Sequence, residues 1–432
     1  MSSEARTEAL TSQVSTADTV KRYSVWIATA AILTSLPAIL SSGTALTTMS
    51  LMGIMIVFSL SYNMLLGQTG LLSFGHAVYY GLGGFFTVHA MNGFGGKALA
   101  IPLPLIPFVG GVTGLMFGII FGSVSTRRAG TSFAMITLGL GELVASASPI
   151  LPTFFGGEEG ISTNRTTLPA FFGLRFGSQL ETYYLIAAWC FVCAALMFAF
   201  TRTPLGRMSM AVRINPERTE FNGYSAAMVR FFVFCVSSFF AGVAGSLAAV
   251  NFELMTVASI SARQSGTVLL MTFVGGVEHF IGPILGAILV VFLQSFLSDL
   301  TDAWMLYFGL LFVAVVVFAP GGLAGLIMLH APLVRRSRLH RIIPYYAVML
   351  LPIALGLVGA AGLVGMARIL WANNSNATVH FLGVECHAGN PLAWGAAVLL
   401  MFAGLWLGRL WASRVSKVFV LLGHEPPKQV GR

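Results

Sequence analysis

Long runs of apolar residues, separated by short polar or glycine-rich stretches, make up most of the chain. A helix needs about 20 mostly apolar residues to cross the hydrocarbon core of a bilayer. The runs that meet or approach this length lie at about 24–41, 46–66, 70–91, 100–123, 130–151, 181–201, 229–250, 265–280, 282–298, 303–328, 345–370 and 393–411. The pattern therefore predicts an all-α integral membrane protein, a polytopic helical bundle of about 10 core spans plus two further C-terminal spans.

The composition points to the same environment. Of the 432 residues, 56% are hydrophobic and only 9% are charged, whereas an ordinary soluble domain carries roughly 25% charged residues. So few charges cannot cover the surface of a soluble protein of this size. A soluble enzyme, a disordered chain and a disulfide scaffold are therefore excluded, and membrane lipid is the expected surrounding.

The distribution of the basic residues predicts the topology. Lys and Arg accumulate in the cytoplasmic loops of membrane proteins, so the net charge of +9 needs no nucleic-acid partner. With the amino terminus inside and about twelve crossings, all but five of the 24 Lys and Arg lie inside; the exceptions are Lys97, Arg165, Arg175, Arg263 and Arg368. We therefore expect both termini in the cytoplasm, with residues 1–20 as a flexible tail that lacks a signal peptide.

The segment 265–280 is short and ends at Gly275-Gly276, so a half-span, a broken helix and a short full span all remain open. With a single crossing over 265–298, the basic cluster Arg335–Arg341 would fall outside. The charge rule therefore favours an even number of crossings there.

Glycines and polar residues interrupt the apolar run that begins near residue 46. Asn63, Gln68, Ser73 and His76 lie among six glycines between residues 63 and 84. Interrupted helices at membrane depth often line a solute path, but small residues also allow tight helix packing. Both interpretations stay open, and they make Asn63, Ser73 and His76 candidates for a translocation pathway.

A carboxylate lies inside another apolar run, where Glu142 follows the residues GTSFAMITLGLG. A charge at the centre of a membrane helix costs roughly 2.5–3.5 kcal/mol. We therefore expect Glu142 to face the interior of the bundle and to pair there, either on a pathway or in a structural hydrogen bond to a neighbouring helix. Thr137, from the same run, is a further pathway candidate.

The long inside loop 202–230 concentrates charges of both signs. Asn222-Gly223 is a helix stop signal. The loop predicts one short amphipathic cytoplasmic helix, which lies on lipid headgroups or docks in the groove of a soluble partner. Its apolar residues recur at helical spacing, at Leu205, Met208, Ala211 and Val212.

Catalytic and metal-binding motifs are not found in the sequence. The only Gly-Lys pair, Gly96-Lys97, is followed by Ala98, so the phosphate-binding pattern GxxxxGK[ST] is missing. We expect no enzymatic activity, cofactor or metal site in this chain, and energy for uphill transport would come from another subunit.

Several motifs in the same order resemble those of the permeases of branched-chain amino-acid ABC importers, of the LivM type. The resemblance covers about residues 20–328. It is carried by NMLLGQTGLLSFGHAVYYGLGG, GTSFAMITLGLGELV, FGGEEGISTN, PLGRMSMAVRINPERTEFNGYSAAMVRFFVFCVSSFFAGVAGSLAA, TVLLMTFVGGVEHFIGPILGA and FAPGGLAGLI. It implies a transmembrane domain over 21–330, followed by a C-terminal extension over 331–432 with a basic linker and two more transmembrane helices.

The resemblance also implies partners: a second, homologous permease, two cytoplasmic ABC ATPases and an extracytoplasmic solute-binding protein, in a bacterial inner membrane. Transport would proceed by alternating access. Loop 202–230 aligns with the family's ATPase-coupling loop, in which the charged residues would contact ATPase grooves. The positions that this match marks are Gly206, Arg207, Arg213, Glu217 and Gly223.

The chain departs from the family pattern at His89, Asn92, Glu278 and His279. These departures leave the solute open: branched-chain or related hydrophobic amino acids are favoured, with aromatic amino acids, urea and short amides as alternatives. A secondary transporter or channel that needs no ATPase is a remote alternative.

Overall fold

The structure is a computed structural model of the chain. The residues that it describes are 24–94, 101–169, 171, 173, 175–300, 304–319, 321–335, 343–371, 378–381, 384–387 and 390–424. The chain divides into two compact units, Met1–Gly325 (unit 1) and Leu326–Arg432 (unit 2). The expected tail over 1–20 lies outside the described residues.

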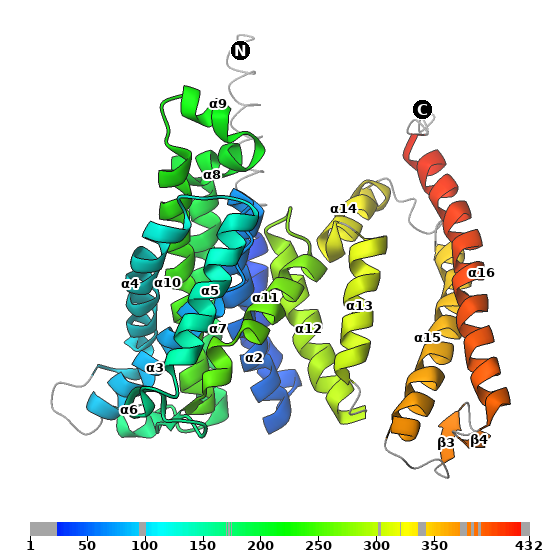
Figure 1. Ribbon diagram of the computed structural model, residues 1–432, viewed down its shortest axis with the longest axis horizontal. Coiled ribbons are helices and arrows are strands. Elements are labelled where there is room, and N and C mark those ends of the chain that lie inside the picture. Colours follow the sequence, from blue (N-terminus) through cyan, green and yellow to red (C-terminus); the bar gives the residue numbers. More distant parts are fainter. Residues whose placement is uncertain are drawn as a thin grey trace, which may run out of the picture. The chain divides into compact units, whose positions relative to one another are not determined.

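Unit 1 is a bundle of helices with almost no strand (Figure 1). Its short elements are the 3-10 helices η2 (Leu103–Leu105), η3 (Arg165–Thr167) and η4 (Val257–Ile260), and the antiparallel pair β1 (Ile161–Ser162) and β2 (Leu254–Met255). Its other helices are Ser24–Ile39, α2 (Gly43–Asn63), the π-helix η1 (Met64–Thr69), α3 (Ala77–Phe94), α4 (Pro107–Ser125), α5 (Thr131–Ala147), α6 (Pro152–Phe155), α7 (Gln179–Arg202), α8 (Pro204–Ile214), α9 (Pro216–Phe221), α10 (Ala226–Phe252), α11 (Ala262–Gly275), α12 (Ile281–Leu300), α13 (Trp304–Phe318) and the start of α14 (Gly322–Arg335).

Unit 2 is a helical hairpin. Its two long helices pack closely because glycines meet: a Cβ on Gly404 would lie 2.7 Å from the Cα of Gly356. The elements are α15 (Ile343–Trp371), the antiparallel strands β3 (Thr378–Phe381) and β4 (Val384–His387), and α16 (Pro391–His424).

The helical membrane fold is confirmed. Among the described residues, 7 helices are long and apolar enough to cross a membrane, and four shorter apolar helices accompany them. The total number of crossings stays a prediction. Three expected spans are interrupted: 70–91 begins with a non-helical segment before α3, 265–280 is the 14-residue helix α11, and 303–328 is divided between α13 and α14. At 1.5 Å per residue α11 is about 21 Å long, which is shorter than the hydrocarbon core.

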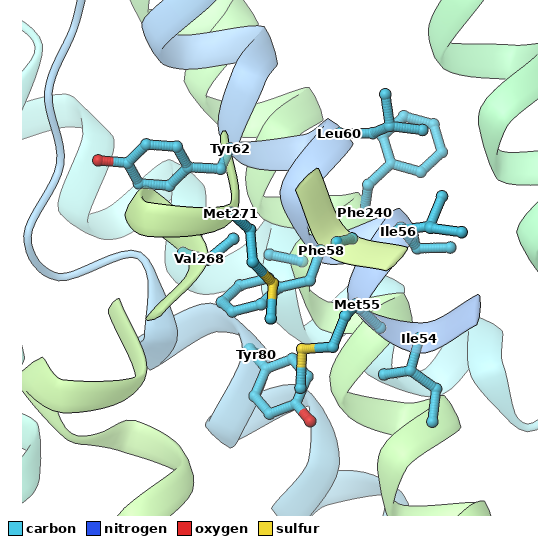
Figure 2. Packing of buried hydrophobic residues seen from close by; sticks show 14 of the residues in the cluster. Ile54, Met55, Ile56, Phe58, Leu60, Tyr62, Tyr80, Phe240, Val268 and Met271 are labelled. Carbon is cyan, nitrogen blue, oxygen red and sulfur yellow. The ribbon is translucent and has the colours of Figure 1, made fainter. Parts of the chain in front are cut away.

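α2 and α10 form the centre of unit 1. Most of each helix is buried, and α2 packs against α7, α10, α11 and α12. Figure 2 shows side chains of α2 directed to several sides, where Phe58 lies beside Tyr80 of α3 and Met271 of α11. The rings of Phe58 and Tyr80 are 4.6 Å apart. A helix that is apolar on all sides is expected at the centre of a bundle.

The seam between α4 and α10 depends on small residues. Glycines recur every fourth residue along α4, and Gly242 of α10 lies against two of them, Gly110 and Gly114. A Cβ on Gly110 would lie 2.5 Å from the carbonyl oxygen of Gly242, and a Cβ on Gly242 would overlap the carbonyl oxygen of Gly110. The two backbones are therefore in contact, as small residues allow in membrane helices.

We expect Gly242→Val to destabilise the bundle, because its side chain would overlap the backbone of α4. Overpacking of this kind costs about 1–3 kcal/mol or more. The measurement is the midpoint of thermal unfolding of the purified protein in detergent. Gly309→Val on α13 is the control, since a Cβ there meets nothing within 4 Å. An equal fall of the unfolding midpoint in the two variants would contradict close backbone packing between α4 and α10.

Candidate functional site

The central helix α2 does not continue to its expected end but changes to the π-helix η1 and then unwinds. Gly70 follows η1 with φ 70°, a left-handed conformation that glycine adopts without strain. The next regular helix, α3, begins at Ala77. We call residues 70–76, which join the two helices, the linking segment. π-Helical turns and interrupted helices are frequent at functional sites.

Side chains from three helices hold the linking segment. Tyr62 Oη donates to the Ser73 carbonyl oxygen at 3.0 Å, and Thr137 Oγ1 of α5 accepts from the Phe74 N–H at 3.3 Å. The hydroxyl of Ser265, on α11, accepts from the Ala77 N–H at 3.0 Å. Backbone groups that a broken helix releases must find partners inside the protein, because lipid offers none.

His76 ends the linking segment and is fully buried. Its Nε2 lies 3.1 Å from the hydroxyl oxygen of Ser61 on α2. Its ring stacks on Phe58 at 5.6 Å and meets Tyr62 edge-on at 5.3 Å. His76 is thus packed against the side chains of α2.

The structure brings Ser73, His76 and Thr137 to the linking segment and places Asn63 at its entrance, directly before η1. All four residues are buried. Three of their polar atoms have no hydrogen-bond partner within the described structure: Asn63 Oδ1, Ser73 Oγ and His76 Nδ1. Because an unpaired buried polar group costs about 1–3 kcal/mol, such a group needs an explanation.

The expectation for Glu142 was wrong. Its side chain was expected to face the interior of the bundle, but it is exposed on α5. The buried face of α5 consists instead of Phe133, Thr137 and Gly141. Of these, Thr137 binds the linking segment. The helical period puts Glu142 on the opposite side, with the exposed residues Met135 and Gly139.

The loop 202–230 forms two helices rather than the one expected. α8 ends at Ile214, and Asn215 is an extended residue whose Oδ1 accepts from the Arg218 N–H at 3.0 Å to begin α9. The reason is Pro216, which disfavours the helical conformation at the residue before it. The predicted stop is confirmed, since α9 ends before Gly223, where φ is 84°. α8 and α9 lie at one end of unit 1, and α6 lies at the other (Figure 1).

The five expected coupling positions differ in their surroundings. Gly206 is buried where α8 leaves α7, and a Cβ on it would overlap the Phe200 carbonyl oxygen. Gly223, Arg207 and Glu217 are exposed. Arg213 is exposed as well, but its Nη1 reaches η1 and donates to the Gly67 carbonyl oxygen at 2.5 Å.

Three apolar side chains at this end were not among the residues expected from the sequence. Phe221 is 91% exposed, Ile214 is 79% exposed and Tyr224 is 47% exposed. We call these residues the α8–α9 patch. The sequence did hold a signal for this patch, because Phe221 is a large aromatic residue in the most highly charged loop of the chain. Exposed apolar clusters rimmed by charges mark interaction sites.

Two of the departures from the family pattern have local structural partners. His89 Nε2 lies 2.9 Å from the Phe154 carbonyl oxygen, and Asn92 Nδ2 donates to the Ser162 carbonyl oxygen at 3.0 Å. Both residues thus hold the segment after α5 against α3. Among the described residues, no group of three or more His, Cys, Asp or Glu side chains is placed to hold a metal ion.

Comparison with known proteins places the chain in a family. LivM, the permease protein of the high-affinity branched-chain amino acid transport system, is 29% identical in Salmonella typhimurium over 71% of this chain and 75% of the relative. The Escherichia coli LivM is 28% identical over the same shares. The ribose import permease protein RbsC of Haemophilus influenzae is 28% identical over 30% of this chain and 42% of its own. No solved structure matches the chain significantly.

These relatives are transport permeases rather than enzymes, and the apolar helices agree with a multi-pass membrane protein. The family model for the permease component of branched-chain amino acid transport systems matches residues 44–320, which is more than half of the chain. The chain therefore belongs to the family of branched-chain amino acid transport system permease components.

Proposed function

We propose that this chain is the transmembrane permease subunit of an ATP-driven importer for branched-chain or related hydrophobic amino acids, working by alternating access. The observation that carries the proposal is the α8–α9 patch. Three apolar side chains stand exposed among charged residues at one end of a membrane bundle. Such a patch needs a water-soluble partner that covers it, and cytoplasmic ATPases of an ABC importer are that partner.

The orientation follows from this assignment. The end of unit 1 that carries α8 and α9 is cytoplasmic, and the end that carries α6 is extracytoplasmic. The positive-inside rule supports the same choice, because Arg202, Arg207, Arg213 and Arg218 lie in or beside α8 and α9. We also propose, from the distribution of the basic residues, that both termini are cytoplasmic, in a bacterial inner membrane.

The linking segment and α5 are the proposed pathway. Asn63, Ser73 and His76 hold unpaired polar atoms beside a chain that is already unwound. In an alternating cycle these atoms gain partners when the packing around the linking segment opens to the solute. Thr137 connects the linking segment to α5, so the two would move together.

The exposed face of α5 supports a second, homologous permease as partner. This face carries a carboxylate, hydroxyls and a glycine, a set that is unfavourable against lipid tails. A second permease that covers the face would form a polar route between the two subunits. The exposed residues of α5 are Thr131, Ser132, Met135, Gly139, Glu142, Leu143 and Ser146, of which Met135 and Leu143 are apolar.

The extracytoplasmic end offers a surface for the solute-binding protein. Glu158 and Glu159 are exposed in the segment between α6 and β1. The segment is held in place, since β1 pairs with β2 and Arg165 Nη1 donates to the Val250 carbonyl oxygen at 3.3 Å. Basic side chains of a binding protein would fit the two carboxylates.

The choice of solute rests on the relatives of this chain. Hydrophobic amino acids are favoured because the LivM relatives transport branched-chain amino acids by name. The ribose relative indicates that the family handles more than one chemical class of solute. Phenylalanine and urea are the alternative solutes in the test, and ribose is included because of this relative.

Uptake in proteoliposomes tests the proposal directly. The chain is reconstituted with its partner permease, ATPases and binding protein, and the uptake of leucine, phenylalanine, urea and ribose is measured. We expect leucine to accumulate against its gradient with functional ATPases only. Leucine uptake that persists with a hydrolysis-deficient ATPase would refute the importer. Uptake of urea or ribose in place of leucine would refute the solute assignment.

We expect Phe221→Ala to weaken association with the ATPases, because a buried aromatic anchor contributes about 2 kcal/mol or more to an interface. That loss corresponds to roughly a 30-fold weaker complex. The measurement is the affinity of purified ATPase for the permease in detergent. Phe252→Ala is the matched control, because Phe252 is also exposed, at 47%, but lies at the far end of α10. Unchanged affinity in Phe221→Ala would contradict docking at the patch.

We expect Glu142→Gln to reduce uptake while leaving ATPase association intact, because the carboxylate borders the route and not the ATPase surface. Glu142 is exposed in this chain, and the proposed second permease would bury it. Removing one partner of such a buried charged contact costs about 2–5 kcal/mol, so the loss should be at least tenfold. Asp299→Asn removes an exposed carboxylate at the end of α12 and is the control. Normal uptake by Glu142→Gln would argue against α5 as part of the pathway.

A further inference from the structure

Arg213 connects α8 to the point where α2 unwinds. It lies in the last turn of α8, and its Nη1 donates to the Gly67 carbonyl oxygen at 2.5 Å. Its stem lies over Gly70, on which a Cβ would be 3.2 Å from Arg213 Cγ. One turn earlier, the hydroxyl oxygen of Ser209 lies 3.4 Å from Gln68 Oε1. α8 therefore contacts η1 through two neighbouring polar pairs.

The Gly67 carbonyl is a suitable acceptor because the helix ends beside it. The N–H groups of Gly70 and Leu71 return to Leu66 and Leu65, so Gly67 lies beyond the last of these backbone bonds. The carbonyls at a helix end carry partial negative charge and attract cations. A hydrogen bond from a guanidinium is charge-assisted, and therefore stronger than one between neutral groups.

The same glycine touches a second interruption of the bundle. A Cβ on Gly67 would lie 2.8 Å from the Val277 carbonyl oxygen, next to Gly276 at the end of α11. Gly276 has φ 107° and lies against Gly321, before the start of α14. Three chain interruptions are thus in backbone contact, and Arg213 holds the first of them.

α8 has two faces with different partners. Towards the bundle, Val212 packs with Ala226 and Val229 of α10, and Arg213 binds η1. Away from the bundle, Ile214 at the end of α8 is 79% exposed. A partner that moves the exposed face would pull directly on the carbonyl end of η1.

We propose that Arg213 is a positioning residue that transmits displacement of α8 to the helix interruptions at Gly67 and Gly276. Its target is the interior of the permease and not an ATPase groove. This inference rests on the proposed function, since the displacement comes from the ATPases. The contacts predict that α8 and η1 move as one unit and that losing the Arg213 donor uncouples ATP hydrolysis from the pathway.

The test compares Arg213→Met, which keeps an apolar stem but removes every donor, with Arg213→Lys, which keeps a cation. In the reconstituted full complex we expect Arg213→Met to retain bound ATPase and basal hydrolysis. Stimulation of hydrolysis by leucine-loaded binding protein, and leucine uptake per ATP, should each fall about tenfold, within the range that mutations along a coupling network produce. Arg213→Lys should recover most of the loss. Arg128→Met, an exposed arginine between α4 and α5, should match the wild type.

Several results would overturn the inference. Wild-type coupling in Arg213→Met would mean that the contact carries no displacement. Loss of ATPase from the complex would make Arg213 a docking residue. A fall in thermal stability and basal hydrolysis together, without recovery in Arg213→Lys, would make it a helix cap only. If the wild-type complex itself shows no ATP-dependent uptake, the proposed function fails instead.

A second measurement does not depend on the Arg213 variants. In a Gln68→Cys/Ser209→Cys variant, the two thiols are bridged with a short bis-methanethiosulfonate, which links them through reducible disulfides, and uptake is measured before and after reduction. We expect uptake to persist in the bridged protein, because the two elements move together. A block that reduction relieves would overturn the inference. Of the four native cysteines, Cys190, Cys193 and Cys235 are buried, and treated wild-type protein controls for reaction at Cys386.

Discussion

The interruption of α2 is the constraint on which the rest of unit 1 depends. A helix that unwinds inside a bilayer releases N–H and carbonyl groups that lipid cannot satisfy. Here Tyr62, Thr137, Ser265 and Arg213 supply partners from four different helices. α2, α5, α8 and α11 are thereby held at fixed positions around one short segment. Moving any of these helices changes the hydrogen bonds of that segment.

Glycine makes so dense an arrangement sterically feasible. The backbones of α4 and α10 touch where Gly110 and Gly242 meet, and the backbones of three interruptions touch near Gly276. Backbones in contact leave no side chains to slide or repack, so these places behave as rigid seams or as hinges. The α4–α10 seam is continuous helix and suits a rigid role. The contacts around Gly276 involve non-helical chain, which suits a hinge.

Unit 1 also has surfaces that neither lipid nor water suits. The carboxylate of Glu142 stands exposed on a membrane helix, and Phe221 stands exposed beside charged residues at the α8 end. A charge against lipid is costly, and a bare aromatic side chain in water favours association. Both features agree with the proposal that the permease is part of a larger assembly whose partners complete these surfaces.

The sequence alone determined the helical membrane class, the family and the main polar interruptions, because apolar runs, scarce charges and ordered motifs are local properties that lipid selects for. It also named Ser73, His76 and Thr137 as candidates for one pathway, and the structure shows that Thr137 contacts the segment that holds Ser73 and His76. Only the tertiary structure decided which way each side chain points. Glu142 is exposed, and Arg213 reaches Gly67 with its guanidinium although the residue itself is exposed. The face that a helix buries depends on helices distant in sequence, and a single-helix pattern does not encode that choice. The division of α8 from α9 was readable at Asn215-Pro216, but the role of Gly67 was not, since its partners at Arg213 and Val277 lie more than a hundred residues away.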